Sequence, residues 1–163
     1  MSSHEPRLSQ ALRELLTRQR VGALGTLGMD GAPWVSLVPF AVDTALRVLV
    51  LHVSALAQHT ANLRRDARAS LLVSQAEVAG EPVHALPRAM LVTQAQTLES
   101  GSEAELSARN AYLQRFPEAA HMTALGDFSF VALTPLGARQ VAGFGAARSL
   151  EADEVVRALR LAP

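Results

Sequence analysis

The stretch Leu46-Arg-Val-Leu-Val-Leu-His-Val53 predicts a β-strand with aliphatic side chains on both of its faces. A strand with one wet face alternates apolar and polar residues, so a run without a polar face should be buried on both sides. In a small antiparallel barrel, one face fills the core. We expect a helix or a second subunit to cover the other face, and we take this as an indication of a homodimer.

Elements of both kinds are predicted on either side of this strand. The apolar spacing and the turn signals predict helices at 7–20, 55–65, 102–116 and 151–161, and strands at 21–27, 34–42, 46–53, 69–73, 88–98, 127–133 and 139–142. Ser102 and Glu105 have the spacing of a capping box. The order lacks strict alternation of strands and helices, which disfavours a doubly wound parallel sheet. It predicts an α+β protein, mainly β, with six or seven antiparallel strands in a small barrel and flanking helices.

Composition limits the function. The 163 residues include 15 acidic side chains, 15 arginines, no lysine and no cysteine. A single domain over residues 1–163 is expected, without a disulfide scaffold, a cysteine metal site or a Schiff-base lysine. The zero net charge argues against nucleic-acid binding, and no histidine pair has simple metal-ligand spacing. Without a leader or a long apolar run, we expect a cytoplasmic protein with no membrane segment.

The junction between the strand at 46–53 and the next helix is a candidate anion site. Directly after Val53, Ser54 is placed to cap a helix that begins at once, and the free amides of its first turn attract anions. Gln58 and His59 add donors within about one turn of the helix. The alternative is an ordinary capped surface helix without a ligand.

Three further residues have both a functional and a structural interpretation. Arg88 opens an apolar strand, either as a charge at the rim or as a contact to a polar ligand. Phe144, between two glycines, either closes over a flat ligand or plugs the barrel mouth. His52 fits a core or interface histidine. The sequence singles out no catalytic acid, base or nucleophile.

Four segments, in order, resemble one family. Residues 31–41, 54–63 and 66–73 are similar to the flavin-binding split barrels related to pyridoxamine 5′-phosphate oxidase, and residues 138–146 resemble the ending of the haem-utilisation branch. Relatives that act on pyridoxamine phosphate usually place Arg and Lys at the phosphate-binding turn, where this chain has Gln58 and His59.

The resemblance implies an antiparallel split β-barrel that binds FMN at the interface of a homodimer. Val35, Ser36, Leu37 and Val38 would line the isoalloxazine edge, largely through backbone groups. The backbone at and after Val53, together with Ser54, Gln58 and His59, would hold the phosphate, with Asn62 nearby. Arg88 would approach the flavin.

Three functions follow from the residues and the resemblance. The first is an FMN-dependent oxidoreductase with a small-molecule substrate and an electron donor that the sequence does not identify. The second is a haem-binding or haem-iron-utilisation protein, with His52, His84 or His121 as the axial ligand. The third is a flavin-binding module without turnover.

Overall fold

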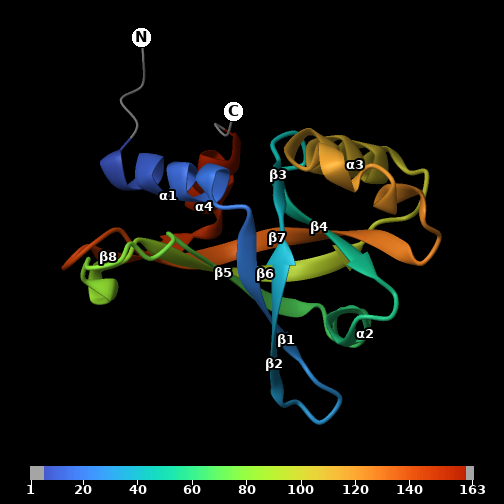
Figure 1. Ribbon diagram of the computed structural model, residues 1–163, viewed down its shortest axis with the longest axis horizontal. Helices are drawn as coiled ribbons and strands as arrows, with labels where there is room; N and C mark the ends of the chain where they lie inside the picture. Colours follow the sequence, from blue (N-terminus) through green and yellow to red (C-terminus); the bar gives the residue numbers. More distant parts are fainter. Residues whose placement is uncertain (1–5, 161–163) are drawn as a thin grey trace.

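The computed structural model describes residues 6–160 and forms one curled antiparallel sheet with helices around it (Figure 1). The helices are α1 Arg7–Arg18, α2 Gln58–Arg65, α3 Glu103–Arg115 and α4 Ala152–Arg160. The strands are β1 Val21–Leu27, β2 Pro33–Pro39, β3 Ala41–Asp43, β4 Val48–Ser54, β5 Arg68–Ser74, β6 Arg88–Thr97, β7 Phe128–Val141 and β8 Ala147–Glu151. Within the described residues, no helix is long and apolar enough to cross a membrane.

The sheet curls because its two edges are joined by a single residue. The strand order is β2-β1-β5-β6-β7-β4-β3, with β8 pairing β7, so β2 and β3 lie at opposite ends of the path. Only Phe40 separates these two strands in sequence. It is fully buried, and its amide donates to the carbonyl of Arg20 at 3.1 Å. The edges must therefore approach each other, which gives the half-closed barrel that the sequence predicts.

Two apolar cores lie on opposite faces of β4. The larger core fills the barrel with β4 residues Leu49, Leu51 and Val53, together with apolar residues of β1, β5, β6 and β7, and is closed at one end by α1 and α4. The second core lies between α3 and the sheet and includes Val48 and Val50 of β4. The strand is therefore buried on both faces, as its sequence predicts. Because α3 covers the second face, β4 carries no evidence for a homodimer.

Most predicted elements are confirmed, and the differences have local causes. The strands predicted at 127–133 and 139–142 are one strand, β7, because a β-bulge at Pro135–Gly137 accommodates the residues that suggested a break. The predicted strand 34–42 divides into β2 and β3 at Phe40. Strand β8 was not predicted. It forms a hairpin with β7 through Gly143 and Gly145, which have φ angles of 120° and 76°.

The predicted start of α3 is confirmed, and the predicted bounds of α4 are confirmed in part. Ser102 caps α3, and its Oγ accepts from the amide of Glu105 at 3.1 Å. The reciprocal bond of a capping box is absent among the described residues, because the amide of Ser102 donates to the carbonyl of Glu99 at 3.1 Å and the Glu105 carboxylate accepts from Arg109. Helix α4 covers most of the predicted 151–161 segment, while Leu161 lies outside the described residues.

The packing of α1 on the barrel end provides a test of the main core. Leu16 is 1% exposed in that core. We expect Leu16→Ala to lower the free energy of unfolding by about 2–5 kcal/mol, because it leaves a cavity. Arg18→Ala, on the exposed side of the same helix, is the control and should change it by about 0.5 kcal/mol or less. Chemical denaturation of both variants checks this, and equal effects would contradict the packing.

Candidate functional site

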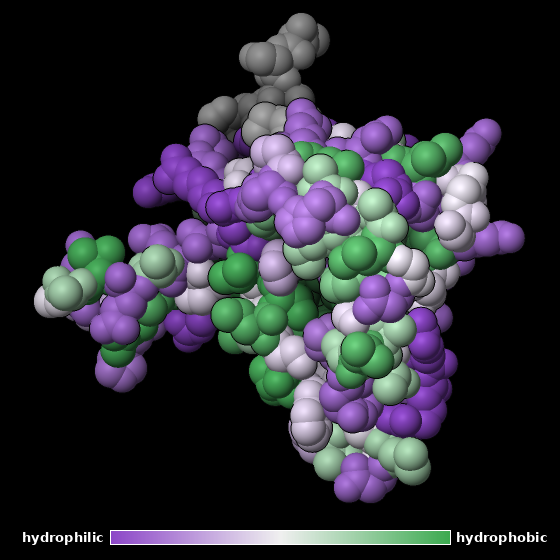
Figure 2. Space-filling model, turned by 45° about the vertical axis from the view of Figure 1, so that its right-hand side comes forward, coloured by the Kyte–Doolittle hydropathy of each residue, from purple (hydrophilic) through white to green (hydrophobic). Residues whose placement is uncertain are grey.

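An exposed apolar face covers the outside of β2, β1, β5 and β6, and we call it the outer face. Strand register places Leu37, Ala23, Leu72 and Met90 side by side across these four strands. Leu37 is 73% exposed, and both Leu72 and Met90 are about 40% exposed. Apolar side chains also gather in the middle of the molecular face seen in Figure 2. A contiguous apolar face of this kind marks a ligand or protein contact.

A hollow of about 390 Å³ opens on the outer face, and we call it the outer-face pocket. The next row of the register, with Val35 and Gly25 beside Ser70, forms its floor. A Cβ added to Gly25 would lie 2.7 Å from Ser70 Oγ, so the small residues create the hollow. The lining residues are mostly apolar, contain no carboxylate, and are Gly25, Thr26, Leu27, Pro33, Trp34, Val35, Arg68, Ala69 and Ser70.

Arg68 supplies the positive charge of this pocket. Its Nη2 lies 2.6 Å from Asp66 Oδ2, and the Arg68 hydrogen bonds lower the pKa of Asp66 to about 2. The same carboxylate raises the pKa of Arg68, which is therefore cationic throughout the physiological range. Because Arg68 is exposed and Asp66 is only half-buried, the pair adds little to stability, but it fixes the guanidinium beside an apolar hollow.

The predicted anion site differs from the sequence interpretation in its capping. Helix α2 begins at Gln58, and its N-cap is Ala57, whose side chain makes no capping bond. Ser54 is the last residue of β4, and its Oγ accepts from the amide of Leu56 at 3.2 Å. The expectation that Ser54 caps the helix was therefore wrong, because a turn at 55–57 separates strand and helix.

The charge around this corner is unfavourable for a phosphate. Ser54 Oγ lies 3.5 Å from the Asp127 carboxylate, and burial lowers the pKa of His59, which is therefore neutral at pH 7. Gln58 donates to Asn62 Oδ1 at 3.0 Å. Arg64 and Arg65 lie in the last turn of α2. The amides of Gln58 and His59 remain as donors, without a permanent cation in that turn.

Asn62 ties α2 to the sheet that bears the pocket. It is fully buried, and its Nδ2 donates to Thr26 Oγ1 at 3.0 Å. Its Oδ1 also accepts from Arg65 Nη2 at 3.1 Å. Asn62 is therefore a structural link between the predicted anion site and the outer-face pocket.

The remaining predicted residues are distributed over both faces of the sheet. Val35 and Leu37 are exposed on the outer face, whereas the side chain of Val38 is buried and Ser36 is half-buried. Val53 faces the barrel core. The side chains of Val35 and Leu37 thus lie on the outer face, and those of Val38 and Val53 do not. The contacts to a flavin through backbone groups of these residues stay a prediction.

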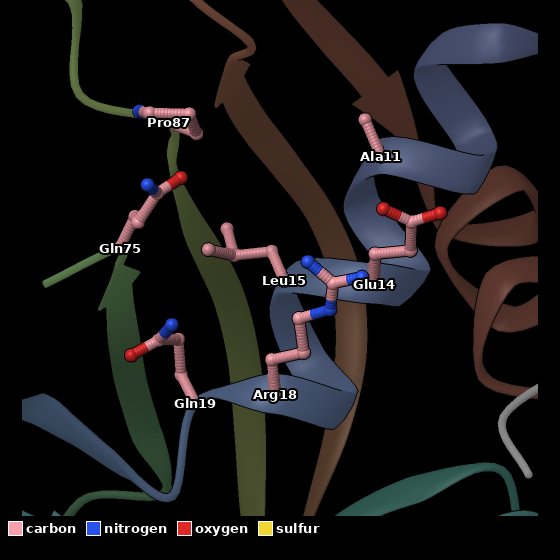
Figure 3. Close-up of a pocket in the computed structure, with 7 residues that line it drawn as sticks. All are labelled: Ala11, Glu14, Leu15, Arg18, Gln19, Gln75 and Pro87. Atoms are coloured by element: carbon pink, nitrogen blue, oxygen red, sulfur yellow. The ribbon is translucent and has the colours of Figure 1, made fainter.

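Arg88 lies at the other end of the sheet. It pairs with Ser74, while Arg68, next to α2, pairs with Gln94. Six residues of extended strand span roughly 20 Å, so one chain does not bring Arg88 and α2 together. The Arg88 guanidinium instead donates to the carbonyl of Leu86 at 3.0 Å. A groove of about 320 Å³ between α1 and this end of the sheet is shown in Figure 3, where Glu14 and Arg18 face Gln75 and Pro87.

The histidines proposed as iron ligands are scattered. His84 and His121 are exposed, and His52 lies within the second core region. None of them lines the outer-face pocket, and residues 6–160 contain no cluster of three metal-binding side chains. Sequence reasoning missed Gly25, Ser70 and Arg68 as pocket residues. They would have been recognised as neighbours if the pairing of β1 with β5 had been predicted.

The curled antiparallel sheet and its flanking helices define a split-barrel protein. The family model of pyridoxamine 5′-phosphate oxidase matches residues 8–142, and the chain belongs to this family.

Three of the similar proteins have names that refer to haem. The chain is 31% identical over 142 residues to the chloroplastic non-canonical haem oxygenase HOZ of Arabidopsis thaliana, covering 85% of this chain but only 41% of that protein. It is 27% identical to the haem oxygenase HutZ of Vibrio cholerae, covering 92% and 85%. A haem-binding protein from Mycobacterium smegmatis superimposes with a TM-score of 0.84 at 28% identity, covering 95% of this chain and 62% of that one.

The Asn62 link can be tested by its effect on stability. We expect Asn62→Leu to lower the free energy of unfolding by about 1–3 kcal/mol, because the buried Thr26 hydroxyl loses its donor. Asn110→Leu, on an exposed position of α3, is the matched control and should change it by about 0.5 kcal/mol or less. Urea denaturation followed by circular dichroism measures both. A neutral Asn62→Leu would show that α2 is held by other contacts.

Proposed function

We propose that this protein binds haem in the outer-face pocket and acts in the use of haem iron. The observation that carries the proposal is the pairing of a mostly apolar hollow with one fixed guanidinium. Haem is a flat apolar ring with carboxylate side chains, and such a ligand suits apolar walls beside a cation. Trp34 and Val35 offer the apolar wall, and Arg68 offers the partner for a propionate.

The relatives support the same ligand. The two similar haem oxygenases and the haem-binding mycobacterial protein come from three distant organisms and cover most of this chain. The chain spans less than half of the Arabidopsis protein. We therefore carry over the ligand, haem, as part of the proposal, and leave the reaction open.

A homodimer is part of the proposal. The outer face exposes leucine and valine side chains on four adjacent strands, and β2 is an edge strand. A second copy packed on this face would bury those side chains and enlarge the pocket. Two-fold symmetry that reversed the strand direction would also bring Arg88 of the second copy toward α2 of the first, which one chain alone does not do.

FMN is the second candidate, favoured by one observation. The amides of Gln58 and His59, which open α2, have no acceptor among the described residues and can bind a phosphate, whereas the amide of Thr60 donates to the carbonyl of Ala57. In that case, the protein would be an FMN-dependent oxidoreductase of this family. The carboxylate of Asp127 near Ser54 and the neutral His59 weaken such a site, which is why haem is preferred.

Parallel titrations with haemin and FMN distinguish the two candidates. We expect haemin to give a saturable Soret band and FMN to show weaker binding or none. Ser70→Trp fills the pocket and should weaken haemin binding by roughly tenfold or more, since about 1.4 kcal/mol corresponds to tenfold. Gln114→Trp, exposed on α3 and away from the outer face, is the control. Tight FMN binding without a Soret band would replace haem by FMN.

The iron ligand is tested in the same titration. His84 and His121 are each replaced by Ala in separate variants. One of the two variants should have a shifted Soret band, because an exposed imidazole can reach the iron at a subunit interface. His52→Ala should leave the band position unchanged, because His52 faces the second core region. A shift in the His52 variant would contradict this assignment.

The dimer is tested by placing a charge on the outer face. We expect Leu72→Asp to convert a dimer to a monomer in analytical ultracentrifugation, because a buried carboxylate without a partner opposes association. Leu106→Asp is the matched control, since Leu106 is exposed on α3, away from this face. A dimer that persists with Asp at position 72 would place the interface elsewhere.

A further inference from the structure

A second hollow lies beneath α3, and we call it the α3 cavity. It has a volume of about 370 Å³ and is lined by residues of β4, α3 and β7 and by the segment 123–126. It adjoins the second core, on the face of β4 that points away from the barrel. The outer-face pocket and the α3 cavity share no lining residue. Its volume is within the range of small-molecule sites, roughly 300–1,000 Å³.

His52 brings an unsatisfied polar group to this cavity. Its ring is stacked on Phe128 with centroids 4.8 Å apart, and it lies 4.5 Å from Phe130. Nδ1 is enclosed and has no hydrogen-bond partner among the described residues. The sequence interpretation of a core histidine is correct in position, but its ring is not satisfied. A buried polar group without a partner in a native fold requires a physical explanation.

The imidazole is neutral at physiological pH. Burial lowers the pKa of His52, the nearby Arg109 lowers it further, and Glu105 raises it by a smaller amount. These are the charged groups that face it from α3, while β7 contributes the two phenylalanines. A neutral imidazole offers one donor and one acceptor, and the residue lines the cavity.

The charges of the cavity balance each other. Nε and Nη2 of Arg109 donate to the same oxygen, Glu105 Oε1, at 3.0 and 2.7 Å. Nη1 of Arg109 donates to the carbonyl of Thr123 at 2.9 Å. Each nitrogen of the guanidinium therefore makes one hydrogen bond, whereas Oε2 of Glu105 receives none within the described part of the chain. A ligand with a net charge would leave that charge uncompensated in this site.

From these contacts we infer that the α3 cavity binds an uncharged planar nitrogen heterocycle of one or two rings that carries an amide or amino group. The rings of His52, Phe128 and Phe130 provide faces for stacking. Glu105 accepts the ligand N–H, and His52 bonds its polar edge. This inference is independent of haem binding, because it uses other residues on another face of the sheet.

Nicotinamide is the probe for this site, with benzoate and benzylammonium as charged compounds of similar size. Two-dimensional NMR of the full chain should show saturable shifts of the His52 ring and of Phe128 with nicotinamide below roughly 10 mM, the affinity expected for so small a ligand. The charged compounds should bind more weakly. Absence of saturable binding, as for a cavity that holds water only, or shifts confined to other residues, would overturn the inference.

Two variants separate binding from folding. His52→Phe keeps an aromatic ring among its neighbours, and should weaken nicotinamide binding by roughly three- to tenfold without loss of stability. Glu105→Gln leaves Arg109 uncompensated, so it should weaken nicotinamide and strengthen benzoate. Glu103→Gln, exposed on the same helix, is the control and should change neither. Unchanged selectivity in the Glu105 variant would overturn the role of the charge balance.

Discussion

The structure depends on the single-residue link between β2 and β3. A flat antiparallel sheet could not place its two edge strands on either side of one buried phenylalanine, so the sheet must curl until those edges approach. The curl gives the sheet a concave side, which the main core fills, and a convex side. Part of the convex side is covered by α3, and the part on β2, β1, β5 and β6 remains exposed. The positions of both hollows follow from this division.

Strands and helices were largely predictable because the spacing of apolar residues within each segment indicates its secondary structure. The double-faced burial of β4 was predicted, but its cause was not, since a strand's sequence does not tell a covering helix from a second subunit. Strand β8 was missed because Ala147–Glu151 contains a single large apolar residue, Leu150, and so shows no alternation of apolar and polar side chains. The start of α2 was misplaced because Ser54 is a good cap by residue type, yet its hydroxyl is used in the turn at Leu56.

The candidate site was less predictable than the fold because it is built from residues that are close only through pairing. Gly25 and Ser70 are unremarkable in sequence, and their neighbourhood exists only once β1 pairs β5. Arg68 acquires its fixed position from Asp66, two residues earlier. Conversely, Arg88 was proposed as a ligand contact because it begins a strand, but the sheet places it far from α2. Local sequence reports the chemistry of a group, whereas register decides which groups meet.

The charges of the protein disfavour a dianionic ligand at the α2 corner and favour a ligand with acidic groups on the outer face. At the α2 corner, a carboxylate near Ser54 and a neutral His59 oppose a dianion, although helix amides attract it. On the outer face, Arg68 is cationic at physiological pH, and the ionised Asp66 bonds its Nε and Nη2. In the proposed haem site, the remaining N–H groups of this guanidinium lie beside an apolar floor and would bind the acidic edge of a flat ligand. With Gln58 and His59 in place of Arg and Lys at the turn, the proposed haem site therefore takes its anion-binding group from the sheet, at Arg68, and not from the helix terminus.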